Sequence, residues 1–121
     1  MHGFLLSDDL IFSSRITGTA RAHGGTLTVF RDAEKLLDNP SATPVAIILD
    51  LHNATLDLPV FLAKLRENLL PIPMVIAYGS HVDAERLRAA RADGCDLVLP
   101  RSAFVDQLET DLSKWLSGFK E

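Results

Sequence analysis

The stretch that most limits how this chain can fold is the apolar run from Val45 to Leu49, which ends on Asp50. An unbroken apolar run of this length predicts a strand that is covered on both faces, as in a parallel sheet. Because an unpaired carboxylate is costly inside a core, Asp50 is expected at the carboxyl end of that strand. Open α/β sheets place their binding sites at this edge. The sequence therefore predicts a site that contains Asp50.

A second acidic feature, Asp8-Asp9, follows the short apolar run that ends at Leu6. If both strands belong to one parallel sheet, their ends bring Asp8, Asp9 and Asp50 to the same edge. Hard cations such as Mg²⁺ prefer carboxylate and carbonyl oxygens as ligands. Candidate Mg²⁺ ligands are thus Asp9, Asp50 and the backbone carbonyl of His52, with Asp8 in the outer coordination shell.

Strand-like and helix-like segments alternate five times along the chain. Strands are predicted at 4–6, 26–30, 45–50, 74–78 and 96–99, and helices at 10–23, 31–37, 58–70, 80–93 and 102–119. With short connections and right-handed crossovers, this order predicts a doubly wound five-stranded parallel sheet with helices on both faces, of the flavodoxin-like kind. A length of 121 residues is typical of one domain, predicted to cover residues 1–121.

Polar residues before the helices predict where several of them begin. Asp8-Asp9 and Ser102 are expected to cap their helices, and the stretch from Ser80 to Asp83 resembles a capping box. Asn39-Pro40 is expected to close the short second helix. The last helix has an apolar side, on which two aromatic residues near the end are expected to be partly exposed and to suit a protein contact: Trp115 and Phe119.

Composition narrows the function classes. A net charge of −4 argues against general nucleic-acid binding. The single cysteine, Cys95, excludes an intramolecular disulfide and is expected to be a buried structural thiol. No signal pattern or membrane-spanning stretch is visible, so the protein is predicted to be cytoplasmic, without a membrane partner.

Other site classes fit the strand ends less well. No glycine-rich phosphate loop follows a strand, and Asp8-Asp9 would repel a phosphate. Asp50-Leu51-His52 begins a cobalamin-type pattern, but Thr55 stands where that pattern needs glycine. A hydrolase arrangement of Ser80, His81 and Asp50 lacks a nucleophile elbow.

Three segments resemble the receiver domain of two-component response regulators, over about Gly3 to Phe119. The segment from Phe4 to Asp9 resembles the first strand and its paired acids, which hold Mg²⁺. The segment ending at Asp50 resembles the strand of the phosphoacceptor aspartate. The stretch from Gly94 to Ser102 resembles the segment that carries a lysine followed by proline. The resemblance implies a (βα)5 receiver-type fold, self-catalysed phosphorylation of Asp50, and a role for Mg²⁺.

The departures from the receiver pattern are as informative as the matches. The switch hydroxyl position falls on Gly79, with Ser80 one residue later as a candidate replacement. The lysine position is Arg101, and the aromatic switch position is Val98. In receivers, the hydroxyl and the lysine hold the phosphoryl group, so these changes suggest that phosphoryl relay is lost or rewired.

Two functions follow from this reading. The first is a stand-alone atypical receiver, not an enzyme, that signals by docking a protein partner such as a histidine kinase or a downstream signalling protein. The alternative is a genuine phosphoacceptor on Asp50, with Mg²⁺ and with Arg101 in place of lysine. A homodimer would use the last two helices and the fifth strand.

Overall fold

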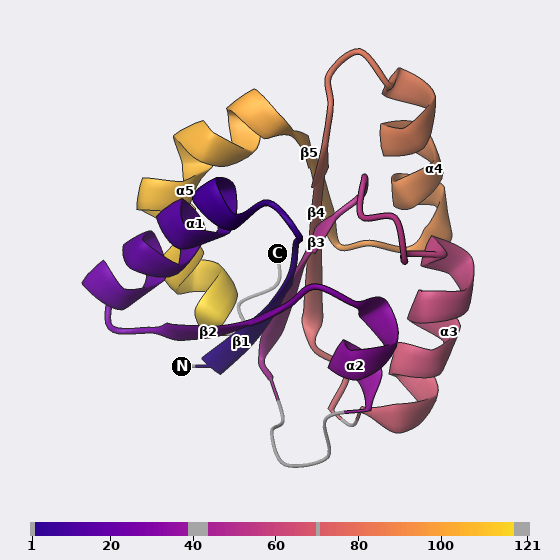
Figure 1. Cartoon of the computed structure of the whole chain (residues 1–121), viewed down its shortest axis with the longest axis horizontal. Coiled ribbons are helices and arrows are strands. Elements are labelled where there is room, and N and C mark those ends of the chain that lie inside the picture. The colour runs from indigo at the N-terminus through magenta and orange to yellow at the C-terminus, as the bar shows by residue number, and fades with distance from the viewer. Residues whose placement is uncertain (1, 39–43, 70, 118–121) are drawn as a thin grey trace.

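The computed structural model describes residues 2–38, 44–69 and 71–117, and it contains five parallel strands that alternate with five helices (Figure 1). The elements are β1 (His2–Leu6), α1 (Leu10–Ala22), β2 (Thr26–Phe30), α2 (Ala33–Leu37), β3 (Ala46–Asp50), α3 (Leu58–Asn68), β4 (Met74–Gly79), α4 (Ala84–Asp93), β5 (Leu97–Pro100) and α5 (Arg101–Leu116). The strand order is β2-β1-β3-β4-β5. The predicted fold class is confirmed.

Helices cover both faces of this sheet. Helices α1 and α5 pack together on one face, and α2, α3 and α4 cover the other (Figure 1). No helix in the described part of the chain is long and apolar enough to cross a membrane.

The central strand β3 supplies side chains to both cores. Ile47 and Leu49 face α2, α3 and α4, whereas Ala46 and Ile48 face α1 and α5. Successive side chains of a strand point to opposite faces, so an apolar run without alternation suits a strand covered on both. All four residues are fully buried, and the strand ends at half-buried Asp50.

Two of the predicted helix starts were wrong. Helix α5 begins at Arg101, directly after Pro100, and has no side-chain cap, so Ser102 lies inside the helix. Helix α4 begins at Ala84, because the Asp83 carboxylate accepts a hydrogen bond from the backbone N–H of Arg86 at 3.1 Å. The predicted cap at Asp9 is confirmed. Asn39-Pro40 lies outside the described residues.

Trp115 is a core residue, and the expectation that it is partly exposed was wrong. Its exposed fraction is 4%, and its ring stacks on Phe104 with the centroids 5.8 Å apart. The apolar side of α5 continues to Leu116, which is also buried, so the end of the helix still lies on the sheet. Phe119 lies outside the described residues.

The burial of Trp115 gives a first prediction. We expect Trp115→Ala to lower the free energy of unfolding by about 3–5 kcal/mol, because it removes a large buried side chain and leaves a cavity. Urea unfolding measures this loss. Val60→Ala, at a position that is 48% exposed on α3, is the control and should change stability little. A small effect of Trp115→Ala would mean that the ring does not support the core.

Candidate functional site at the carboxyl edge of the sheet

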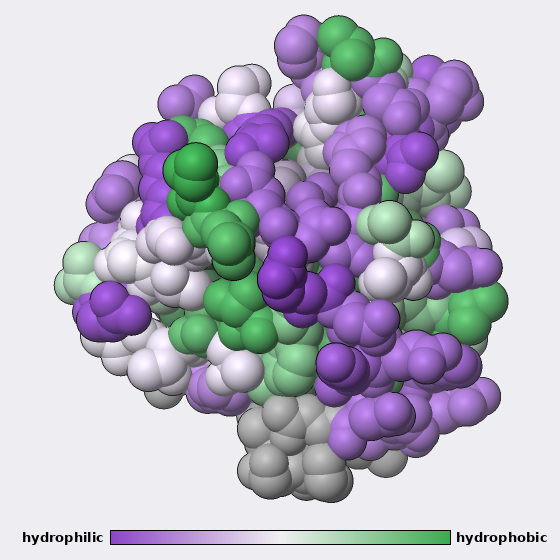
Figure 2. Space-filling model, in the orientation of Figure 1, coloured by the Kyte–Doolittle hydropathy of each residue, from purple (hydrophilic) through white to green (hydrophobic). Residues whose placement is uncertain are grey.

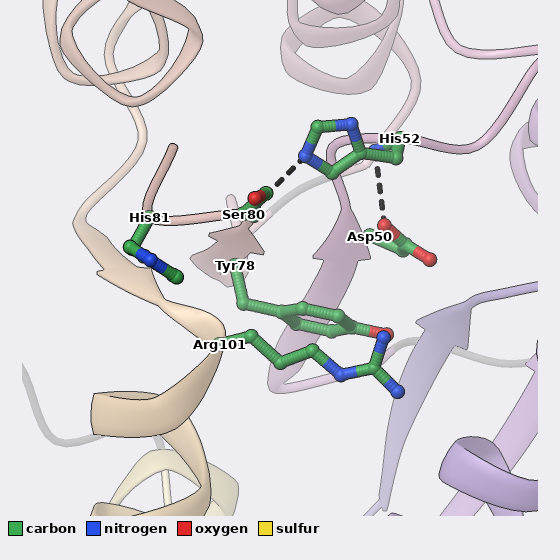
Figure 3. A pocket seen from close by; sticks show the side chains of 7 residues that line it. Asp50, His52, Tyr78, Ser80, His81 and Arg101 are labelled. Atoms are coloured by element: carbon green, nitrogen blue, oxygen red, sulfur yellow. Dashed lines mark hydrogen bonds between the residues drawn. The ribbon is translucent and has the colours of Figure 1, made fainter. Parts of the chain in front are cut away.

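A hollow of about 350 Å³ opens at the carboxyl ends of β3 and β4, beside the start of α5 (Figure 3). Four residues predicted for the site from the sequence line it, namely Asp50, His52, Ser80 and Arg101. The complete lining is Asp50, His52, Tyr78, Gly79, Ser80, His81 and Arg101.

Asp50 is held by the backbone of the loop that follows β3. Its Oδ1 accepts a hydrogen bond from the backbone N–H of His52 at 2.9 Å (Figure 3). Burial raises the pKa of Asp50, and the nearby Asp8 carboxylate raises it further, whereas the His52 N–H and Arg101 lower it. The net effect is a raised pKa, so the ionised form of Asp50 is disfavoured here.

At the same edge of the sheet, after β1, Asp9 forms an ion pair with Arg101. Asp9 Oδ1 accepts the Phe12 backbone N–H at 2.9 Å, and Oδ2 accepts from Arg101 Nη2 at 3.1 Å. The Arg101 guanidinium also lies over the Phe12 ring, 3.9 Å from its centroid. The Phe12 N–H, with help from Arg101, lowers the pKa of Asp9. The Asp9 carboxylate is thus stabilised by groups of the protein itself.

Several of the oxygens predicted to hold Mg²⁺ accept hydrogen bonds from the protein itself. Both Asp9 oxygens and one Asp50 oxygen already accept hydrogen bonds. Within residues 2–38, 44–69 and 71–117, no three His, Cys, Asp or Glu side chains are grouped so that they could hold a metal ion. A divalent cation would compete with these donors for the Asp9 and Asp50 oxygens. The ligand set of Asp8, Asp9, Asp50 and the His52 carbonyl stays a prediction.

His52 fills the space beside Gly79, the position where the receiver pattern has its switch hydroxyl. A Cβ atom built on Gly79 would lie 3.3 Å from His52 Nε2. The same nitrogen accepts the backbone N–H of Ser80 at 2.9 Å (Figure 3). Arg86, in the first turn of α4, also contacts the loop after β3, because its Nη1 donates to the Leu51 carbonyl at 2.9 Å. The loop after β3 therefore holds the loop after β4.

Ser80 was the candidate replacement for the switch hydroxyl. Its hydroxyl oxygen accepts the Val82 backbone N–H at 3.3 Å, so it serves the turn in which it lies. The backbone of Ser80, rather than its side chain, makes the contact with His52. The proposed switch role of Ser80 stays a prediction.

Tyr78 is a site residue that sequence reasoning missed. Its ring is buried between α1 and α5 and stacks on Phe104 at 4.7 Å, while its hydroxyl reaches the hollow beside Arg101 (Figure 3). The hydroxyl has no partner with hydrogen-bond geometry in the described part of the chain, although the nearby Ser7 side chain acts to lower its pKa. Burial, and then the charge of Asp50, raises the pKa of Tyr78. Its one sequence signal was a lone tyrosine at a strand end.

Comparisons with known proteins agree with the fold. Neither a protein-family model nor a curated protein sequence matches the chain. Among solved structures, NtrX from Brucella abortus in complex with ADP superposes with a TM-score of 0.77 at 16% identity, over 96% of this chain and 26% of its own. The Francisella response regulator 1452 receiver domain superposes with a TM-score of 0.77 at 20% sequence identity, and the match covers 96% of each chain.

A third structure, a response regulator from Burkholderia pseudomallei with a phosphorylated aspartic acid, calcium ion and citrate, gives a TM-score of 0.70 at 17% identity, over 93% of this chain and 69% of its own. The chain thus has the fold of response-regulator receiver domains. It spans about a quarter of the length of NtrX, which carries further segments.

The raised pKa of Asp50 gives a second prediction. The native state holds this proton more tightly than the unfolded chain, so the stabilisation is present at acid pH and is lost as pH rises through the raised pKa. At neutral pH the carboxylate is destabilising. Asp50→Asn should therefore stabilise the metal-free protein by at most about 1 kcal/mol, because the group is partly solvated.

Urea unfolding of both proteins in EDTA, at neutral and at acid pH, checks this prediction. The difference should shrink at acid pH, where Asp50 is protonated, and grow in an Arg101→Ala background. Clear destabilisation by Asp50→Asn at neutral pH would show that the ionised carboxylate is held by favourable contacts.

Proposed function

We propose that this protein is a receiver-type signalling module that acts by docking a protein partner, with phosphorylation of Asp50 absent or secondary. One observation carries the proposal: the place of the switch hydroxyl is taken by Gly79, and the adjoining space is filled by the His52 ring. The resemblance to receivers assigns the hydroxyl to the phosphoryl group, and this chain has none at that position.

The hydrogen bond from Ser80 to His52 supports the proposal. In a receiver, contacts with the phosphoryl group draw the loop after β4 toward the site. Here the His52 ring already holds that loop through the Ser80 backbone N–H. A ligand can shift a conformational equilibrium only by binding one state better than the other. Because His52 already holds the loop after β4, a phosphoryl group on Asp50 would shift the conformation of that loop less.

Arg101 also supports the proposal. A lysine ammonium is a compact charge on a flexible stem, whereas a guanidinium is a planar group that pairs and stacks. The Arg101 guanidinium is paired with Asp9 and stacked on Phe12. The cation at the lysine position is therefore directed at Asp9.

A docking role fits the surface around the hollow. Leu10 and Ile11 are 65% and 87% exposed directly after Asp9, and Val82 is 80% exposed directly after His81. Figure 2 shows hydrophobic side chains gathered over α1 and the adjoining sheet, within a largely hydrophilic surface. Exposed apolar groups with a polar surround suit a protein contact. We infer a protein partner, a histidine kinase or a downstream signalling protein.

Other parts of the sequence interpretation also stay predictions. These are the homodimer through α4, β5 and α5, the cytoplasmic location, and the lack of a nucleic-acid partner. Trp115, which was expected to contribute to the dimer face, is buried and does not support it.

The alternative function is a genuine phosphoacceptor on Asp50, with Mg²⁺. The observation that favours it is the position of Asp50, half-buried at a hollow that Arg101 also lines. A phosphorylated aspartic acid is described for the Burkholderia pseudomallei response regulator of the same fold.

Incubation with acetyl phosphate and Mg²⁺ separates the two functions. We expect no stable increase in intact mass, because the phosphoryl group would meet neither a switch hydroxyl nor a free cation. A parallel beryllofluoride titration followed by NMR detects a site whose adduct hydrolyses quickly. A phosphoryl adduct that disappears in Asp50→Asn would overturn the proposal and establish the alternative.

The contact between His52 and Ser80 gives a further prediction. In His52→Ala, hydrogen exchange of the Ser80 amide should become about fivefold faster, because one hydrogen bond is worth roughly 1 kcal/mol. NMR measures this rate without a partner or a phosphodonor. His81→Ala is the matched control, since His81 is exposed and lines the same hollow as His52, whereas the Ser80 N–H donates to His52. Equal exchange in all three proteins would show that the ring does not hold the loop.

A further inference from the structure

The acidic edge of this sheet contains a cation of its own. Two neighbouring acids, Asp8 and Asp9, follow β1, and Asp50 ends the adjacent strand β3. Carboxylates this close disfavour shared ionisation unless a positive charge offsets them. Arg101 provides such a charge, since it pairs with Asp9, helps the Phe12 N–H to lower the pKa of Asp9, and offsets part of the rise in the pKa of Asp50.

Arg101 is held in this position by more than its ion pair. The guanidinium lies 3.9 Å above the centroid of the Phe12 ring, and Phe12 is buried against α5 and β4. The Phe12 backbone N–H also donates to the Asp9 carboxylate, so one residue positions both partners of the pair. A cation over an aromatic face adds electrostatic attraction to the ion pair.

The start of α5 places the stem of Arg101. Because Pro100 ends β5 and Arg101 is the first residue of the helix, the side chain leaves the backbone at the sheet edge. Figure 3 shows the side chain running beneath Tyr78 and Asp50, with its guanidinium beside the Tyr78 hydroxyl. An external ion would have to enter space that this side chain uses.

We propose that Arg101 is a tethered counter-cation that competes with divalent cations for Asp9, so that part of the negative charge of the edge is offset without a metal ion. This inference deepens the proposed function and rests on it for the role of the site. It explains how the edge keeps three carboxylates in a module that does not depend on metal-assisted phosphoryl transfer.

If Arg101 competes with a metal ion for Asp9, removal of the guanidinium should raise the affinity of the edge for a divalent cation. A divalent ion that binds Asp9 must first break the ion pair and the stack on Phe12. Removing the guanidinium frees Asp9 Oδ2 and leaves the acids without a counter-charge. Arg101→Ala should therefore bind Mn²⁺ more tightly than the natural chain by about tenfold, the equivalent of about 1.4 kcal/mol.

The experiment is a titration with Mn²⁺ alone, in which electron paramagnetic resonance counts the free ion. Arg101→Met, which keeps an apolar stem over Phe12, serves as a second variant in case Arg101→Ala is poorly folded. Arg88→Ala removes a positive charge from an exposed pair with Glu85 on α4 and is the matched control. The double variant Asp9→Asn, Arg101→Met should lose the gain.

Tighter binding in the Arg101 variants, with no change in Arg88→Ala, would support the proposal. Equal or weaker binding in folded Arg101→Met would overturn it, because Arg101 would then not compete with the ion. No phosphodonor is present, so this result is independent of whether Asp50 is phosphorylated. If the Arg101 variants bind Mn²⁺ more tightly and Asp50 is also phosphorylated, the proposed function is wrong but this inference still holds.

Discussion

The structure depends on the burial of β3 on both faces. Its side chains from Ala46 to Leu49 are fully covered by two separate helix layers, so neither face of the strand can accommodate a charge. The first position where solvent reaches the strand is Asp50. The site is therefore placed by the core, and the loops only decide which groups meet the carboxylate.

The carboxylates at this edge are contacted by backbone N–H groups and by a charged side chain of the protein. Asp50 accepts a hydrogen bond from the His52 N–H, whereas Asp9 accepts hydrogen bonds from the Phe12 N–H and from Arg101. The two acids are consequently treated in opposite ways: the pKa of Asp50 is raised by burial, and that of Asp9 is lowered by its hydrogen bonds. Burial and hydrogen bonding thus shift the pKa values of two neighbouring carboxylates in opposite directions.

The sequence was sufficient for the fold and for placing Asp50 at the carboxyl edge of the sheet, where the candidate site lies, because apolar periodicity and strand-terminal acids are local signals. It was not sufficient for contacts between distant side chains. That the His52 ring adjoins Gly79, or that the Tyr78 hydroxyl reaches the hollow, depends on the packing of neighbouring strands. Trp115 was misjudged for a similar reason: its burial depends on how far α5 stays in contact with the sheet.

The proposed function needs two arrangements of the loop after β4 that a partner binds with different affinity, because binding can only redistribute existing states. The Ser80 N–H in that loop donates to the imidazole ring of His52, and the ring belongs to the loop that follows Asp50 itself. Any movement of that loop therefore moves the acceptor of the hydrogen bond. A partner that contacts the loop after β3 would reach the loop after β4 through His52, without covalent change at Asp50. Coupling of this kind needs only that the partner bind one loop arrangement more tightly than the other.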